Sequence, residues 1–264
     1  MLRQICTSCP LLQQLYLRNE SHADMPLNIA CVANLEDLRR LQLPLMLQTP
    51  SAVGKLQNLR HLTLQRQQLW PDMDWLFVVR EIIHVKRYEL QRLSFDGSWL
   101  SRPLDLSLLQ LHKCFALKEL LLSNCNLADP RDRLTLPLSC VRFSLKDCTV
   151  NKLHSYVRGT TMLHLLELNK CQLTNDDGKF IMGLLKQRQQ LPILYPLRLR
   201  FSGSFSLRLE LIGWKARKPE LWEDWLQVEE VLGNGLTSWK QQRAAFNMSF
   251  GAPLQVPPDL KNLF

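Results

Sequence analysis

The chain of 264 residues contains no uninterrupted apolar run near the ~18 residues of a membrane-spanning helix, so we expect no membrane span. Its opening residues, MLRQICTSCP, lack the apolar core of a secretory signal peptide. Eight cysteines in a chain without such a peptide indicate reduced thiols rather than disulfides. These absences predict a cytoplasmic or nuclear location.

Recognised catalytic and metal-binding motifs are also missing. The sequence has no G-x-S-x-G, no phosphate-binding G-x-x-x-x-G-K and no H-E-x-x-H, and its six histidines are scattered. Cys6 and Cys9 form a C-x-x-C pair, but no second pair of matching spacing follows, as a zinc site would need. We therefore expect a non-catalytic protein with no metal and no other cofactor.

Regularly spaced leucine is what the chain has in abundance. The stretch from Leu117 to Leu127, LKELLLSNCNL, has the spacing of the leucine-rich repeat signature, in which a short strand is followed by a tight turn. One such unit cannot bury its own apolar face and needs neighbours. The same pattern starts at eight places along the chain: Leu12, Leu38, Leu59, Leu90, Leu117, Cys140, Leu163 and Leu194.

Between the strand segments, the spacing leaves room for helices. Residues 174 to 191 begin with Thr174 as a helix cap and carry Asp176 and Asp177 in the expected first turn. Residues 72 to 88 carry apolar side chains at helical spacing. These features predict an α/β fold: a leucine-rich-repeat solenoid, or horseshoe, with a parallel β-sheet on its concave face and helices or irregular segments on its convex face.

The pattern changes after residue 200. Alternating apolar residues over 201–214 predict one or two strands, with a turn at Gly203. The spacing of apolar residues predicts helices over 218–233 and 237–246. We therefore expect a solenoid over residues 1–200, a C-terminal strand and helix cap over 201–250, and a loose tail over 251–264.

Three cysteines recur at one offset within their units. Cys125, Cys148 and Cys171 each follow a strand, where a small apolar side chain fits a cramped turn, so we expect them buried and reduced. The segment 171–199, CQLTNDDGKFIMGLLKQRQQLPILYPLRL, and the opening CPLLQQLYL resemble the cysteine-containing repeats of F-box/leucine-rich-repeat proteins. The resemblance extends over roughly residues 5 to 200.

The resemblance implies a protein-binding module, namely the substrate-recruiting repeat domain of an F-box-type ubiquitin ligase receptor. It departs from the family in one respect, because no F-box precedes the repeats. We therefore expect ubiquitin ligase subunits to bind only if an F-box is supplied. The first alternative is a leucine-rich-repeat scaffold with no ubiquitin role.

Basic residues recur at strand positions that face away from the core. The formal net charge of +9 favours acidic partners. The predicted partner-binding residues lie on the concave face, and arginine there offers bidentate contacts to carboxylate or phosphate groups: Arg40, Arg92, Arg142, Arg198 and Arg200. The alternative is that this face is solvated surface. A nucleic-acid-binding protein is the second functional alternative, although no groove-reading or base-stacking motif supports it.

Overall fold

The structure is a computed structural model of the chain, and the description covers only part of it. The residues described are 1–17, 27–44, 47–65, 72–98, 103–127, 136–150, 152–157, 160–174, 176–177, 179–181, 183–184, 197–203, 213, 216–217, 226–232 and 235–238. For 72–75, 226–232 and 235–238, only the course of the backbone is described.

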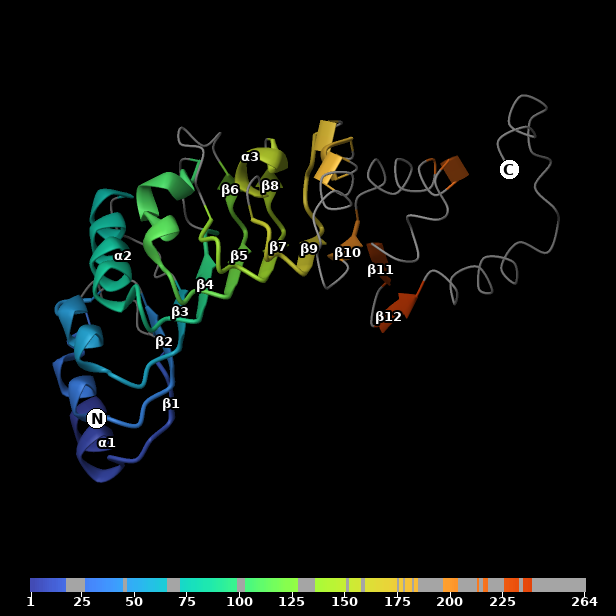
Figure 1. Ribbon diagram of the computed structural model, residues 1–264. Coiled ribbons are helices and arrows are strands. Elements are labelled where there is room, and N and C mark those ends of the chain that lie inside the picture. Colours follow the sequence, from blue (N-terminus) through green and yellow to red (C-terminus); the bar gives the residue numbers. More distant parts are fainter. Residues whose placement is uncertain are drawn as a thin grey trace.

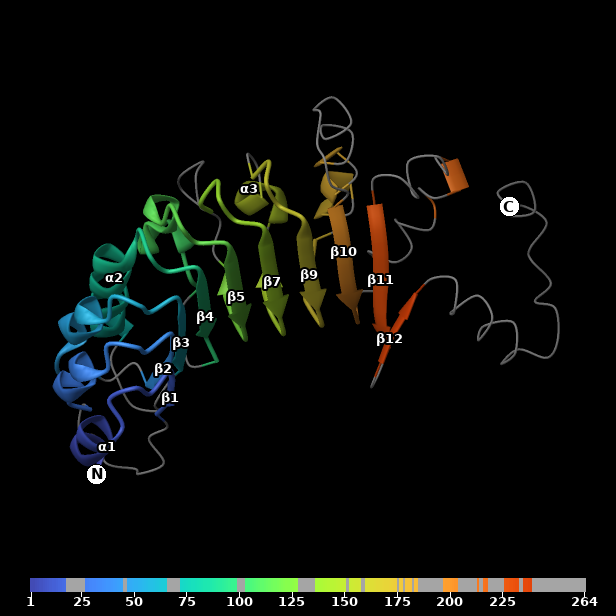
Figure 2. The same ribbon diagram turned by 60° about the horizontal axis from the view of Figure 1, so that its bottom comes forward.

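A single curved sheet runs through the described residues (Figures 1 and 2). Its first nine strands are parallel and lie in chain order, and the last pairs antiparallel. The strands are β1 (Gln14–Tyr16), β2 (Arg40–Pro44), β3 (His61–Gln65), β4 (Arg92–Asp96), β5 (Glu119–Ser123), β7 (Arg142–Lys146), β9 (Leu165–Asn169), β10 (Leu197–Ser202), β11 (Leu226–Leu232) and β12 (Gly235–Ser238). A second, two-stranded sheet pairs β6 (Asn126–Leu127) with β8 (Thr149–Val150).

The helices and 3-10 turns lie on the outer side of the curve, so the main sheet forms the concave face (Figure 2). The convex elements are α1 (Leu2–Ser8), η1 (Ala30–Asn34), η2 (Pro50–Lys55), α2 (Asp72–Lys86), η3 (Leu106–Leu109), η4 (Leu111–Lys113) and α3 (Leu153–Val157). This is the α/β leucine-rich-repeat solenoid that the sequence predicts. Among the described residues, no helix combines the length and apolar character needed to cross a bilayer.

The core lies between the sheet and the convex segments, and repeated leucines build it. Equivalent residues of neighbouring strands stand side by side, and each is at most 1% exposed: Leu41, Leu62, Leu93, Leu120, Phe143, Leu166 and Leu199. One buried residue of each strand therefore packs on the next, and burial of such a side chain contributes about 1.5–3 kcal/mol. All eight predicted strand segments are confirmed.

The turn that follows β5, β7, β9 and β10 is also repeated. Asn124, Asp147, Lys170 and Gly203 occupy the same place in successive units, and each has a φ between 52° and 71°. This left-handed conformation favours glycine, and Gly203 confirms the predicted turn. The next residues are Cys125, Cys148 and Cys171, which are 1%, 1% and 5% exposed and all free, as predicted.

The thiols of these three cysteines are hydrogen-bonded to the strand that precedes them. Sγ donates to the carbonyl two residues earlier, at 3.2 Å for Cys125 and Cys148 and 3.5 Å for Cys171. A hydrogen bond to Cys148, together with burial, raises the pKa of both Cys125 and Cys171. Cys125 and Cys171 are therefore structural, since thiols that remain protonated are poor nucleophiles. The hydrogen bonds from these two thiols lower the pKa of Cys148, which lies between them.

The two cysteines of the C-x-x-C pair differ in their exposure to solvent. Cys6 lies in α1 and is buried, whereas Cys9 is exposed. Burial, and then a hydrogen bond to Cys31, raise the pKa of Cys6 to about 11. In the part of the chain that the structure describes, no group of three or more potential metal ligands is found.

Both predicted convex helices are present in the described residues. The helix expected over 72–88 is α2. Residues 176–177, 179–181 and 183–184 are helical, which agrees with the helix expected after Thr174.

The predicted register of the eighth unit is wrong by two residues. Leu199 stands beside Leu166 and Phe201 beside Leu168, whereas the leucine spacing placed Leu197 and Leu199 there. A two-residue shift keeps the same side chains facing inward, so alternation in the sequence does not distinguish the two registers. Burial of Phe201, which is 1% exposed, distinguishes them.

The helix predicted over 218–233 is wrong at 226–232, which form β11 beside β10. The helix predicted over 237–246 is wrong at Thr237 and Ser238, which belong to β12. The edge of β10 provides hydrogen-bond partners that local helix propensity does not take into account. Of the strands expected over 201–214, residues 201–202 belong to β10, whereas Gly213 is helical and the prediction is wrong there. Residues 204–212, residue 214 and the tail over 251–264 lie outside the described residues, and the division of the chain at residue 200 remains a proposal.

Candidate partner-binding face

Side chains that alternate with the buried leucines form columns across the concave face. The first column contains Gln14, Arg40, His61, Arg92, Glu119, Arg142, Leu165 and Arg198. Adjacent members lie about 4.8 Å apart, the spacing of paired strands. The predicted alignment of Arg40, Arg92 and Arg142 is confirmed. Arg198 joins this column because of the shifted register, and Arg200 lies in the next column beside Glu167.

Two glutamates interleave with the arginines and form ion pairs with them. Arg142 donates to Glu167 Oε2 from Nε at 3.0 Å and from NH2 at 2.7 Å, and its NH1 lies 3.4 Å from Glu119 Oε2. Arg92 NH1 is 3.5 Å from the same Glu119 oxygen, and Arg200 NH1 is 3.2 Å from Glu167 Oε1. We call these five residues the charge ladder. Three of the five predicted arginines therefore already face carboxylates of the same sheet.

Glu167 is the most sheltered carboxylate of the charge ladder. Its side chain is only 14% exposed. Burial raises its pKa, but hydrogen bonds from Arg142, Ser144 and Arg200 and the charge of Arg142 outweigh burial, so the pKa is lowered overall. Glu167 is therefore ionised at neutral pH and holds Arg142 and Arg200 in place.

A pocket of about 170 Å³ lies beyond the ladder, towards the N-terminal end of the concave face. It is lined by Tyr16, Arg40, Leu41, His61, Thr63 and Arg92, and we call it the concave pocket. Arg40 is exposed, and within the described part of the chain it makes no ion pair. A carboxylate or phosphate bound here would meet a guanidinium that no described glutamate or aspartate neutralises.

The electrostatics of His61 report the potential in this pocket. Burial lowers the pKa of His61, the positive charges of Arg40 and Arg92 lower it further, and Glu119 acts in the opposite direction. The net effect keeps the imidazole neutral at neutral pH. Burial is the largest of these causes, and the arginine charges add a positive potential that favours a bound anion.

Sequence reasoning found the arginines but not their pairing. Glu119 has the same offset in its unit as Arg92 and Arg142, which was the signal that it would lie between them. Tyr16 and Thr63 also face the concave surface, but only their place beside Arg40 shows that they share a pocket with it.

No protein-family model matches the chain, and no curated protein matches it. Among solved structures, the chain is similar to an internalin of Listeria monocytogenes, with 14% identity and a TM-score of 0.43. The match covers 84% of this chain and 62% of the internalin, so the chain spans less than two thirds of that structure. This similarity carries no argument about function. The assignment as a leucine-rich-repeat solenoid rests on the register of the parallel strands and on the repeated turn that follows them.

Proposed function

We propose that the protein is a protein-interaction module whose concave face binds an acidic or phosphorylated segment of a partner. The observation that carries the proposal is Arg40, which forms no ion pair among the described residues and lines a pocket where burial, and then the charges of Arg40 and Arg92, lower the pKa of His61. An anionic side chain entering this pocket would convert an unfavourable concentration of positive charge into a charge-assisted hydrogen bond.

The lining residues supply complementary contacts. The guanidinium of Arg40 binds a carboxylate or phosphate in a bidentate manner, and the Thr63 hydroxyl and His61 ring add donors. Tyr16, which is 58% exposed, offers an aromatic surface to the rest of the partner segment. A charge-assisted contact contributes roughly 1.5–3 kcal/mol when sheltered.

The predicted arginines have different parts in this proposal. Arg40 is the main anion contact, and Arg92 contributes while sharing Glu119. Arg142, Arg198 and Arg200 extend the binding surface across β7 and β10. Because Arg142 and Arg200 are already paired with glutamates, a partner anion gains less from them than from Arg40.

The test compares two neighbouring arginines. Arg40→Glu reverses the charge in the concave pocket, whereas Arg39→Glu makes the same charge change at an exposed residue that precedes β2 and does not line the pocket. We expect affinity capture with quantitative mass spectrometry to show loss of the partner with Arg40→Glu and retention with Arg39→Glu. Both variants should unfold at the wild-type urea midpoint. Equal capture by the two variants would refute the concave pocket as the binding site.

His61 provides a second measurement on the same site. A bound anion favours the protonated imidazole, so complex formation raises the lowered pKa of His61 and takes up a proton as the pH falls towards that pKa. We therefore expect the captured partner, or an acidic peptide derived from it, to bind more tightly at pH 5.5 than at pH 7.5. Replacement of His61 by Gln should remove this pH dependence, and unchanged dependence in that variant would argue against the assignment.

The finer form of the proposal is a substrate-recruiting repeat domain of an F-box-type ubiquitin ligase receptor. It is supported by the F-box/leucine-rich-repeat resemblance, including the register of Cys125, Cys148 and Cys171. Its test is the stability of the captured partner in cells. If the partner accumulates when the gene is deleted and falls when it is re-expressed, in a proteasome-dependent way, recruitment for ubiquitination is supported. Unchanged abundance, with binding intact, identifies the chain as an interaction scaffold.

A further inference from the structure

The turns that lead into the strands repeat one backbone geometry. In each, an N–H donates to the carbonyl oxygen three residues earlier, at 3.0–3.3 Å. The donors are Leu38, Leu59, Leu117, Cys140 and Leu163. The residue four positions before the first residue of the strand is exposed in successive units: Glu36, Gln57, Tyr88, Phe115, Leu138 and Thr161. This position therefore forms a column along the edge of the sheet where the strands begin.

Three consecutive members of this column are large and apolar. Tyr88, Phe115 and Leu138 are 63%, 62% and 63% exposed. The rings of Tyr88 and Phe115 stack at 5.5 Å between centres. The Ser139 hydroxyl donates to Leu117 O at 2.8 Å, which holds the turn of Leu138 against the turn of Phe115. We call these three residues the apolar stripe. Contiguous exposed apolar side chains of this kind mark an interaction surface, whereas single ones do not.

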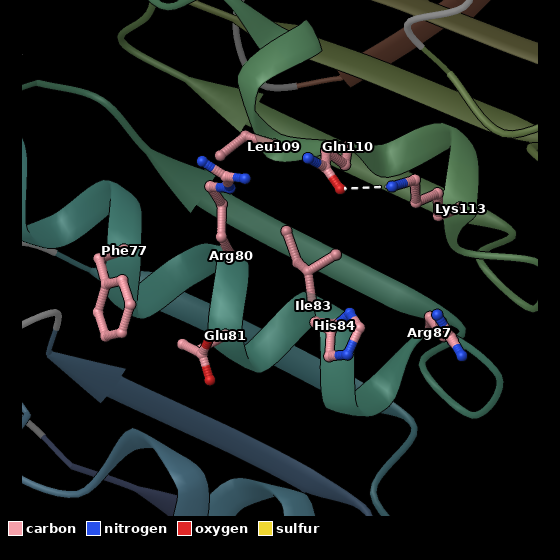
Figure 3. A pocket seen from close by; sticks show the side chains of 9 residues that line it. All are labelled: Phe77, Arg80, Glu81, Ile83, His84, Arg87, Leu109, Gln110 and Lys113. Atoms are coloured by element: carbon pink, nitrogen blue, oxygen red, sulfur yellow. Dashed lines mark hydrogen bonds between the residues drawn. The ribbon is translucent and has the colours of Figure 1, made fainter.

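Positive charge lies beside the apolar stripe. The Arg87 guanidinium is 4.8 Å from the centre of the Tyr88 ring. Figure 3 shows Arg87 and Lys113 on opposite walls of a pocket of about 340 Å³ that both of them line. Neither forms an ion pair among the described residues. The one carboxylate in the three turns, residues 86–90, 113–117 and 136–140, is Glu89, which pairs with buried Lys86. The surroundings of the stripe therefore favour an acidic ligand.

The spacing of the stripe matches one turn of an α-helix. Neighbouring members are separated by the stacking of the repeats, which is about 4.8 Å between strands and 5.5 Å between the two rings. A helix that lies across the strands presents one apolar residue per turn and rises about 5.4 Å per turn. An extended segment places same-face side chains about 6.6–6.8 Å apart, so it would be displaced by about 3 Å after two intervals.

From these observations we propose that the apolar stripe binds an acidic amphipathic helix of a partner protein. The apolar face of the helix packs on Tyr88, Phe115 and Leu138, and its Asp or Glu side chains meet Arg87 and Lys113. A second copy of this chain would bring like charges together, because the formal net charge is +9. The stripe lies outside the concave pocket, so this inference does not depend on the proposed function.

The proposal is tested on the full chain by fluorescence anisotropy with a labelled model peptide of about 15 residues, which carries leucines on one helical face and glutamates beside them. We expect it to bind at least about tenfold tighter than a scrambled peptide of the same composition, and than a peptide with lysine in place of glutamate. Equal binding of the scrambled peptide would overturn a helical ligand, and equal binding of the lysine peptide would overturn charge complementarity. Absence of binding by the acidic helix would overturn the whole proposal.

Substitutions locate the binding. Leu138→Ser should weaken binding of the acidic helix about tenfold. Leu11→Ser is the matched control, since Leu11 is 76% exposed in the turn before β1 and lies outside the stripe, and it should bind as wild type does. Both should keep the wild-type urea midpoint. Equal loss in the two variants would refute the stripe. Arg40→Glu should leave binding unchanged, and loss with Arg40→Glu but not with Leu138→Ser would place the peptide in the concave pocket instead.

A charge reversal tests the acidic flank. Lys113→Glu should weaken binding of the acidic helix and strengthen binding of the lysine peptide, whereas Lys55→Glu, at an exposed lysine of η2, should change neither. Equal effects of the two variants would show that only net charge matters and would overturn the site. Binding to phosphatidylserine vesicles, or dimerisation of the chain, that is lost with Leu138→Ser while the acidic helix does not bind would identify a different occupant and overturn the proposal.

Discussion

Asp177 joins two successive repeats, and its replacement should destabilise the solenoid although the residue contacts no proposed ligand. Its side chain is 1% exposed. Oδ1 accepts from the Leu153 N–H at 2.8 Å, which is the first N–H of α3 in the preceding unit. Oδ2 accepts from the Thr174 N–H at 2.6 Å and the Thr174 hydroxyl at 2.8 Å. One carboxylate therefore accepts hydrogen bonds from backbone N–H groups at the start of two helical segments.

The expected cost follows from these three bonds. Replacing Asp177 by Ala leaves the Leu153 N–H buried without its acceptor, at about 1–3 kcal/mol. The two bonds to Thr174 contribute about 0.5–1.5 kcal/mol each, and the lower end applies because Thr174 is exposed and water can replace them. We expect a total loss of about 2–4 kcal/mol. Asp177→Asn should lose less, since its amide oxygen still accepts from Leu153.

The neighbouring residue is the matched control. Asp176 is 83% exposed and pairs only with Lys179, at 3.3 Å, in the described structure. Its replacement by Ala should cost less than about 1 kcal/mol. Urea unfolding followed by far-ultraviolet circular dichroism measures the stability of both variants. If the unfolding free energy depends on urea concentration with the same slope in both, their midpoints can be compared directly.

Hydrogen exchange adds a local measurement. In Asp177→Ala, the amide of Leu153 should exchange faster, while amides in β2 and β3 keep their protection. Similar midpoints for Asp176→Ala and Asp177→Ala, or an unchanged exchange rate at Leu153, would refute the connection between the two repeats.

Three further predictions concern the core, the charge ladder and the thiols. Leu166→Ala should lower the free energy of unfolding by about 2–5 kcal/mol in the same urea assay, because Leu166 is fully buried; a loss under about 1 kcal/mol would contradict its place in the core. Glu167→Gln should be less stable than wild type at neutral pH. The pKa of Glu167 is lowered in the folded state, so its stabilising effect is present above about pH 4.5 and is lost as the pH falls through the folded pKa. The urea midpoints of the two proteins should therefore converge in acid. A constant difference down to about pH 3 would exclude the mechanism. Burial raises the pKa of Cys140 to about 12, so a thiol reagent should label exposed Cys9 rapidly and Cys140 only after unfolding; simultaneous labelling would mean that the core is open.

Local and periodic information predicted most of the solenoid. A leucine two residues from the next points to the same side of a strand, so Leu120 and Leu122 identified β5 without any knowledge of its neighbours. The repeated offset of Cys125, Cys148 and Cys171 likewise predicted their burial. Helix α2 could be recognised because its apolar side chains recur at helical spacing over 15 residues.

The sequence pattern within one repeat did not predict the interactions between repeats. The alternation that identifies a strand is unchanged by a two-residue shift, so the register of β10 depended on the packing of Phe201. Residues 226–232 became a strand because β10 offered an open edge, although their own spacing favoured a helix. In both places the deciding partner is far away in the sequence.

The candidate sites, too, were predicted in part from the sequence and decided in part by the tertiary structure. The sequence by itself determined which face carries Arg40, Arg92 and Arg142, because side-chain direction follows from position within a strand. Only the tertiary structure decided that Glu119 and Glu167 neutralise some of these arginines and leave Arg40 without an ion pair in the described residues. It also brought Tyr88 and Phe115 into one stripe from separate units. The physical reason is that an ion pair or a pocket depends on distances of a few ångströms between strands or helices, and those distances are set by stacking of the repeats rather than by any one repeat.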